Sequence, residues 1–248
     1  MDAVKTGRGY AKWFNDDYLS LYAHRDEREA RWLADLIAAR FPPVRGGMTL
    51  DLGCGAGGHL PFLSAHQRTV GLDRSAWLLD VARDHDPGMP LVVGDMRCLP
   101  FRDGAFTLVV NLFTSFGYFA DDAQNRRVLA EVARVMAPRG WLVLDFVNAP
   151  FTRQSAVMPG LPPADLGRAP QRRDVPPSRR FVRRTISLEC EGKVFTEGVR
   201  LFEPGELTTM LLECGYTVAD ICGDYAGRPL TATSPRAIIL AKRTENQL

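Results

Sequence analysis

Between residues 45 and 148, short apolar runs alternate with helical stretches, and this alternation constrains the fold more than any other feature. Each apolar run has the length of a buried strand. Strands that alternate with helices in this way form a parallel sheet with helices on both faces. The pattern predicts strands at residues 48–52, 69–72, 91–93, 106–112 and 141–146, and helices at 60–65, 76–84 and 122–136.

Three predicted features lie outside this alternating region. Residues 10–39 predict an aromatic-rich amphipathic helix, which Phe41-Pro42-Pro43 ends. Residues 149–180 hold many prolines and arginines and predict an irregular loop. Residues 181–189 and 194–202 alternate like two strands of a hairpin.

The C-terminal region completes the expected sheet. Pro204 begins a helix that runs to residue 214, and Gly215 occupies the position of a helix C-cap. Strands follow at residues 217–222 and 237–241. We therefore expect an α/β fold with a doubly wound, seven-stranded, mostly parallel sheet whose last strand is antiparallel. The expected parts are an N-terminal helical lid (1–44), a core (45–148), a loop and β-hairpin insert (149–203) and the C-terminal part of the core sheet (204–248).

Charge and cysteine content exclude several classes of protein. The formal net charge is only +2, so a global nucleic-acid-binding charge is absent. None of the five cysteines forms a C-x-x-C pair, so we expect neither a metal site nor a redox motif. The first thirty residues lack the apolar stretch of a signal peptide, and no run of about 18 apolar residues predicts a membrane span. We expect a cytoplasmic protein with reduced thiols, and the excess of arginine over lysine suggests a bacterial source.

A glycine-rich segment, Asp51-Leu-Gly-Cys-Gly-Ala-Gly-Gly58, joins one predicted strand to the next helix. Glycines allow a tight turn and close approach of a ligand, and the helix N-terminus offers free N–H groups. Gly53, Gly55 and Gly58 satisfy the G-x-G-x-x-G pattern, and Asp73 ends the following strand twenty residues after Gly53. A dinucleotide site is therefore one interpretation of this loop.

Acidic residues favour a different ligand. Asp51 precedes the glycines. Its carboxylate would face the negative pyrophosphate of a dinucleotide, which is unfavourable, whereas it suits a ligand that bears an ammonium group. Gly94-Asp95-Met96 follows the third strand and places another carboxylate on the same sheet edge. That carboxylate can accept from an adenine amino group, with Met96 against the ring. No nicotinamide pocket is evident after the glycines.

These motifs resemble the class I S-adenosylmethionine-dependent methyltransferases over residues 45–147. Asp51-Leu-Gly-Cys-Gly is similar to the family's first motif, Asp73 to its ribose-binding acid, and Asp95-Met96 to its adenine-binding pair. Residues 106–113 and 139–145 are similar to the segments at its fourth and fifth strands. The resemblance implies S-adenosylmethionine as cofactor and S-adenosylhomocysteine as product. It implies cofactor contacts by Asp51, Gly53, Gly55, Asp73, Arg74, Asp95, Met96, Asn111, Phe113 and Arg25.

The sequence lacks two motifs that are typical of particular classes of methyl acceptor. Residues 111–114 read Asn-Leu-Phe-Thr, without the Asn/Asp-Pro-Pro-aromatic motif typical of members that methylate adenine or planar amide nitrogens. No Pro-Cys pair occurs, which disfavours cytosine C5 methylation. We therefore expect transfer to nitrogen or oxygen of a small metabolite, and residues 111–119 resemble the small-amine and amino-sugar branch. Candidate acceptor contacts are Tyr18, Tyr22, Phe116, Tyr118 and Tyr225, and candidate catalytic residues are His24 and Tyr118.

Seven arginines gather within residues 168–184. A solvated face is the common outcome of such a run. A phosphate or carboxylate on the acceptor is the sharper interpretation, because arginine binds these groups as a bidentate fork. A tRNA or rRNA partner and a non-catalytic S-adenosylmethionine-binding regulator are the alternatives. We expect no membrane partner, we disfavour nucleic acid, and the sequence predicts no oligomeric state.

Overall fold

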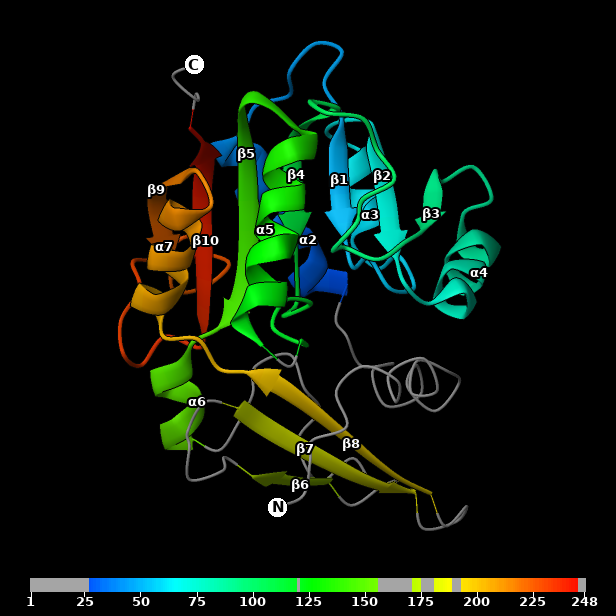
Figure 1. The fold of residues 1–248 in the computed structure, drawn as a ribbon. Coiled ribbons are helices and arrows are strands. Elements are labelled where there is room, and N and C mark those ends of the chain that lie inside the picture. Colours follow the sequence, from blue (N-terminus) through cyan, green and yellow to red (C-terminus); the bar gives the residue numbers. More distant parts are fainter. Residues whose placement is uncertain (1–26, 120, 156–170, 175–180, 189–192, 245–248) are drawn as a thin grey trace.

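A seven-stranded sheet forms the centre of the computed structural model (Figure 1), which describes residues 27–119, 121–155, 171–174, 181–188 and 193–244. The strand order is β3-β2-β1-β4-β5-β10-β9. The strands are β1 (Thr49–Leu52), β2 (Thr69–Asp73), β3 (Leu91–Val93), β4 (Phe106–Asn111), β5 (Met136–Val147), β9 (Tyr216–Cys222) and β10 (Arg236–Arg243). The strands from β1 to β5 pair in parallel, and β10 is antiparallel to β5 and β9. The predicted doubly wound sheet is confirmed.

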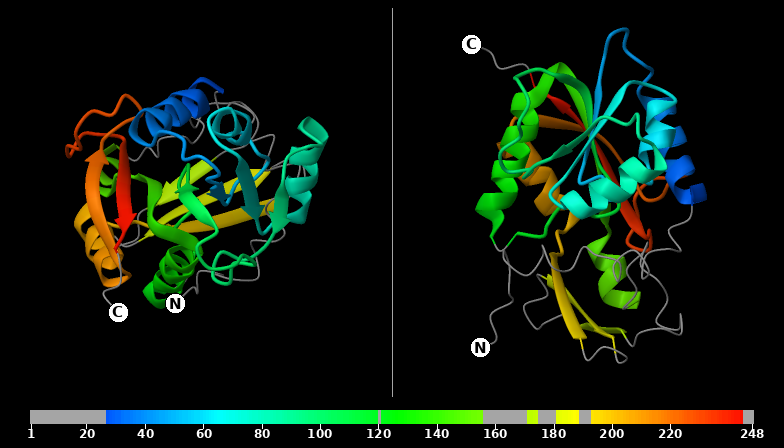
Figure 2. Two further views of the ribbon diagram at one scale, coloured as in Figure 1. Left: turned by 90° about the horizontal axis from the view of Figure 1, so that it is seen from above. Right: turned by 90° about the vertical axis from the view of Figure 1, so that its right-hand side faces the viewer.

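Helices cover both faces of the sheet, as Figure 2 shows from above. The helices around the sheet are α2 (Glu27–Arg40), α3 (Leu60–Ser64), α4 (Ala76–His85), α5 (Asp122–Val135) and α7 (Pro204–Glu213). Successive strand residues point to opposite faces. In β4, Leu108 packs in the cluster with α2 and α3, whereas Val109 packs in the cluster with α5 and α7. The central strands β1 and β4 are almost entirely buried because both faces of the sheet are covered there, whereas the edge strand β9 is partly exposed.

Local signals fix where the helices begin and end. The Asp121 side chain accepts from Gln124 N at 2.8 Å and caps α5, and Ser75 does the same for α4. Glu203 and Glu206 form a capping box around the start of α7. Gly215 ends α7 with φ +85°, a conformation that a side chain would disfavour. The predicted helix over 10–39 is observed from Glu27, and its earlier residues lie outside the described part.

A smaller three-stranded sheet lies beyond the carboxyl ends of the parallel strands (Figures 1 and 2). It consists of β6 (Gln171–Asp174), β7 (Phe181–Leu188) and β8 (Lys193–Arg200), all antiparallel. Arg200 N donates to Gly117 O at 2.8 Å and fixes the end of β8 to the core. The predicted hairpin is confirmed as β7 and β8.

The prediction of an irregular loop over residues 149–180 was wrong in two places. Helix α6 (Ala149–Ser155) follows β5 directly, and Thr152 N donates to Asn148 O at 2.9 Å. Pro150 falls in the first turn of this helix, where a missing N–H costs nothing. Strand β6 forms by pairing with β7, whose partner residues lie nine or more positions further along the chain. The local sequence of β6 therefore did not indicate a strand.

None of the described helices has the length and apolar character that a membrane span requires.

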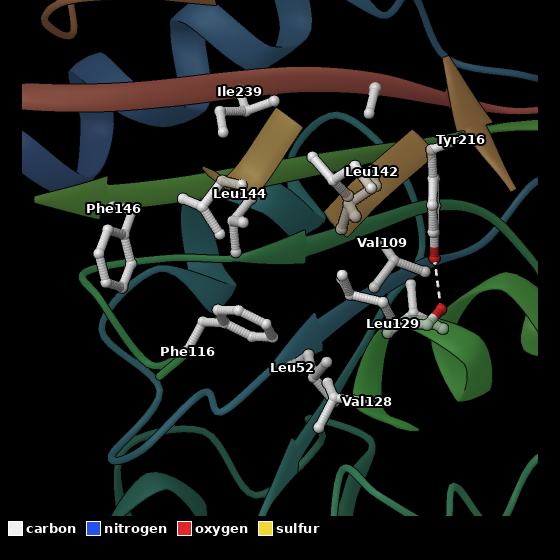
Figure 3. Close-up of a cluster of buried hydrophobic side chains, with 14 of the residues drawn as sticks. Leu52, Val109, Phe116, Val128, Leu129, Leu142, Leu144, Phe146, Tyr216 and Ile239 are labelled. Atoms are coloured by element: carbon white, nitrogen blue, oxygen red, sulfur yellow. Dashed lines mark hydrogen bonds between the residues drawn. The ribbon is translucent and has the colours of Figure 1, made fainter. Parts of the chain in front are cut away.

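Tyr216 ties β9 to α5 inside the hydrophobic core. Figure 3 shows its hydroxyl donating to Leu129 O, at 2.7 Å, among buried aliphatic side chains. The ring is fully buried and fills space between the sheet and the helix layer. The hydroxyl therefore adds one hydrogen bond to a packing contact.

We expect Tyr216→Phe to lower the free energy of unfolding by about 1 kcal/mol, because only the hydrogen bond is lost. Tyr216→Ala should cost about 3–5 kcal/mol, because a cavity is added. Urea unfolding would measure both values, with Thr217→Ser at the exposed neighbouring position as control. Equal losses for the two Tyr216 variants would contradict this account.

Candidate cofactor-binding and active site

The glycine-rich loop between β1 and α3 approaches two other elements closely. Gly53 has φ +81°, and its N–H donates to Leu72 O on β2 at 2.7 Å. A Cβ at this position would lie 2.8 Å from Ser115 Cβ, so a larger residue does not fit. Ser115 Oγ donates to Gly53 O at 3.2 Å. The loop is therefore fixed between β2 and the loop that follows β4.

Asp73, at the end of β2, is part of the same support. Its carboxylate accepts from Gly55 N at 2.9 Å and from Ser75 N at 2.8 Å. Burial raises the pKa of Asp73, and these backbone donors partly oppose the rise. A carboxylate offers about four acceptor positions. The carboxylate therefore retains capacity to accept from a hydroxyl donor such as that of a ribose.

Two buried oxygen atoms at the carboxyl edge have no hydrogen-bond partner among the described residues. Asp51, at 1% exposure, leaves Oδ2 without one, and Asn111, at 2% exposure, leaves Oδ1 without one. These residues lie on the adjacent strands β1 and β4, where Asp51 pairs in register with Val110. The Asn111 amide donates to Leu52 O at 2.6 Å, which directs its oxygen elsewhere. Buried acceptors normally have partners, so this pair fits a donor-rich cationic group such as an ammonium.

The charge state of Asp51 depends on pH in the neutral range. Burial raises its pKa to about 7, and repulsion by Asp73 adds to the effect. A cation bound beside Asp51 would stabilise the ionised form. The site therefore gains affinity for a cation as the pH rises through this range.

Asp95 lies in the loop after β3, where Arg97 holds its carboxylate. The Arg97 Nη2 donates to Asp95 Oδ2 at 2.6 Å, and the hydrogen bonds from Arg97 lower the pKa of Asp95. Met96 is half-buried against the core, and the exposed Arg74 also lowers the pKa of Asp95 through its charge. The structure thus brings the predicted Asp95, Met96 and Arg74 to one edge.

The loop after β4 is held by a buried ion pair that the sequence reasoning missed. Phe113 and Thr114 have φ +52° and +64°, which is uncommon for residues with side chains. Asp145, fully buried on β5, accepts from Phe113 N at 2.9 Å. Arg236, on β10 and 3% exposed, donates to Asp145 Oδ1 at 2.7 Å and to Thr114 Oγ1 at 3.2 Å. The pair therefore fixes the left-handed segment.

An aromatic row extends along this loop. The rings of His59 and Phe113 lie 4.7 Å apart, and Tyr225 stacks on Phe113 at 6.1 Å. The Tyr225 hydroxyl donates to Asp145 Oδ2 at 3.1 Å, so Tyr225 belongs to the same cluster. His59 and the Asp145–Arg236 pair were not predicted as site residues, because only the fold brings them to Phe113.

The other predicted acceptor contacts have different outcomes. Phe116 is only 1% exposed and packs against Phe202 in the core, which corrects its assignment as an acceptor contact. Tyr118 is half-buried beside the same core, and its role stays a prediction. Tyr18, Tyr22, His24 and Arg25 lie outside the described residues. Of the arginine cluster, the described backbone includes Arg172, Arg173, Arg183 and Arg184 on β6 and β7.

Comparison with known proteins agrees with this geometry. Residues 49–140 match the pattern of a methyltransferase domain. The chain is 30% identical over 146 residues to a mouse protein called probable tRNA methyltransferase 9B, covering 54% of this chain and 32% of that protein. It is 36% identical over 119 residues to the Streptomyces venezuelae dTDP-3-amino-3,4,6-trideoxy-alpha-D-glucopyranose N,N-dimethyltransferase, covering 47% of this chain and 48% of that protein. The chain thus spans less than half the length of these curated relatives.

A solved structure shows the same fold over nearly the whole chain. It is an S-adenosylmethionine-dependent methyltransferase from Clostridium acetobutylicum, with a TM-score of 0.73, 18% identity, and coverage of 95% of this chain and 99% of that one. The sheet order and the glycine loop are those of a Rossmann-like methyltransferase fold. Residues 49–140 therefore resemble the class I S-adenosylmethionine-dependent methyltransferases in both sequence and fold. Within the described residues, no group of three or more His, Cys, Asp or Glu side chains is placed to hold a metal ion.

We expect Asp51→Asn to stabilise the fold at about pH 8 and to give less advantage at about pH 4. The folded-state pKa of Asp51 lies above the ordinary value of 3.8, so folding favours the protonated form. The contribution of Asp51 to the free energy of unfolding is complete below its pKa in the unfolded chain. This contribution is lost as the pH rises through about 7. Each unit of the shift corresponds to about 1.4 kcal/mol.

Urea unfolding of both proteins across this pH range would test the expectation. Asp84→Asn, which changes an exposed carboxylate of α4, is the matched control. A difference between Asp51→Asn and wild type that stays constant with pH would contradict the assignment.

Proposed function

We propose that this chain transfers a methyl group from S-adenosylmethionine to nitrogen or oxygen of a small-molecule metabolite. The observation that carries the proposal is the pair of buried oxygens, Asp51 Oδ2 and Asn111 Oδ1, which lack a partner within the described part of the chain and lie beside a glycine loop at the carboxyl edge. Ligands in open α/β sheets bind outside this edge. Asp51 and Asp73 lie near the carboxyl ends of β1 and β2, and Asp95 follows the neighbouring β3, so one ligand can contact all three.

Each acidic residue has a distinct role in this proposal. Asp51 and Asn111 accept from the ammonium group of the cofactor, Asp73 accepts from the ribose hydroxyls, and Asp95 accepts from the adenine amino group. When bound, the cofactor supplies a methyl group that its sulfonium charge already activates. The protein aligns the two reactants and excludes water.

The proposed acceptor carries an amine and an anionic group. Two observations support this class of acceptor. The name of the curated amino-sugar relative says that it acts on a dTDP-linked sugar, and arginines lie close together in sequence on β6 and β7, beyond the carboxyl edge. An amine that arrives uncharged needs no general base, whereas a hydroxyl does. His24 and Tyr118 stay predicted candidates for that role.

A tRNA acceptor is the second candidate, because a curated relative of similar identity is called a probable tRNA methyltransferase. Phosphate contacts by arginine would make RNA binding strongly dependent on salt. The same arginines thus serve either candidate, and salt dependence separates them.

We expect S-adenosylhomocysteine to bind the wild-type protein with micromolar affinity and NAD not to bind. Asp73→Ala should weaken S-adenosylhomocysteine binding about tenfold or more, roughly 1.4 kcal/mol, because the ribose hydroxyls lose their acceptor. Isothermal titration calorimetry measures each value, with Asp84→Asn as control. Binding of NAD without S-adenosylhomocysteine would overturn the proposed function and favour the dinucleotide interpretation.

Transfer of labelled methyl groups would identify the acceptor class. We expect turnover with a dTDP-linked amino sugar, and a rise in its KM of about tenfold or more when Arg172, Arg173, Arg183 and Arg184 are changed to Gln, since the anionic group loses its partners. An amine of similar size that carries no anionic group serves as the control substrate. Labelling of tRNA alone, with binding that falls steeply with salt, would support the RNA alternative. Cofactor binding without transfer to any pool would favour a non-catalytic regulator.

A further inference from the structure

Arg97 makes an unusually complete contact with one carboxylate. Its main-chain N and its Nε donate to Asp95 Oδ1 at 2.9 and 3.0 Å, and its Nη2 donates to Asp95 Oδ2 at 2.6 Å. Arg97, which lies two residues after Asp95 in the chain, therefore binds both oxygens of its carboxylate. This fork leaves Asp95 little freedom to rotate.

The other side of the Arg97 guanidinium is also held. Its Nη1 donates to Gln124 Oε1 in the first turn of α5, and the Gln124 amide donates to Asp121 Oδ2 at 2.8 Å. The guanidinium carbon lies 4.7 Å from the centre of the Phe119 ring. Arg97 thus connects the loop after β3 to the start of α5 and is fixed from both directions.

We propose that Arg97 is a positioning residue that orients Asp95 toward the exocyclic amino group of adenine and so makes the site select an amino-bearing purine. The proposal rests on the proposed function, because it assumes that Asp95 meets the adenine of the cofactor. A carboxylate has about four acceptor positions, and Arg97 occupies three of them. The remaining position accepts from an amino group but faces the oxygen of a hypoxanthine unfavourably.

The charge of Asp95 is set by the same contacts. Hydrogen bonds from Arg97 are the largest cause of its lowered pKa, and the charge of Arg74, from the loop after β2, acts in the same direction. The charge of Asp121, at the start of α5, also acts on Arg97 and raises the pKa of its guanidinium. Removing the guanidinium would leave Asp95 more easily protonated and free to rotate, and a protonated carboxyl is a poorer acceptor.

The test measures the binding of S-adenosylhomocysteine and S-inosylhomocysteine by calorimetry, which needs no acceptor. We expect wild type to prefer the adenine compound about tenfold or more. Arg97→Gln should weaken binding of the adenine compound about tenfold, reduce the preference for it, and move the loss of affinity on acidification to a higher pH than in wild type. Asp51 titrates in every variant, so the pH effect is taken as the difference from wild type.

Two further variants keep the test decisive. Arg97→Lys retains the charge without the fork, so it should restore the pH profile but not the full preference for adenine. Arg83→Gln removes an exposed Arg–Asp pair on α4 and is the matched control. If the Arg97→Gln protein fails to fold, Arg97→Lys becomes the test. An Arg97→Lys protein that prefers the adenine compound as strongly as wild type would overturn the proposal. Unchanged preference and pH profile in a folded Arg97→Gln would also overturn it, whereas no binding by wild type would instead overturn the proposed function.

Discussion

The buried pair of Asp145 and Arg236 is the interaction on which the carboxyl edge of this sheet depends. The two side chains join β5 to β10, and through Phe113 N and Thr114 Oγ1 they also hold the loop after β4. Removing one partner of such a pair costs about 3–5 kcal/mol, because the other charge stays buried. The backbone around Phe113 is left-handed, so this loop needs that support.

Support of a different kind surrounds the cofactor end of the edge. There Asp73 binds the glycine loop and Arg97 binds Asp95, so two of the three acidic residues have partners without a ligand. Asp51 is the exception, and its burial opposes stability at neutral pH. The fold therefore retains an unfavourable group at the position where a cation would bind.

Local patterns in the sequence predicted the sheet, the glycine loop and the acidic residues, because each depends on neighbours in the chain. Leu91–Val93 is observed as predicted, and Gly215 has the positive φ of a C-cap. The Asp145–Arg236 pair could not be predicted in this way, since 91 residues separate its members. Phe116 was predicted as an acceptor contact, although packing against Phe202 places it in the core.

The small sheet joins the core at two points that are each fixed independently of what lies between them. At the exit from β5, the Asn148 amide donates to Thr231 O and Ser234 O, and at the return from β8, Arg200 N donates to Gly117 O. The order of the seven core strands does not depend on the segment between these anchors. Under the proposed function, that segment is therefore an exchangeable module, in which insertions and substitutions would change acceptor choice while the cofactor-binding half stays the same.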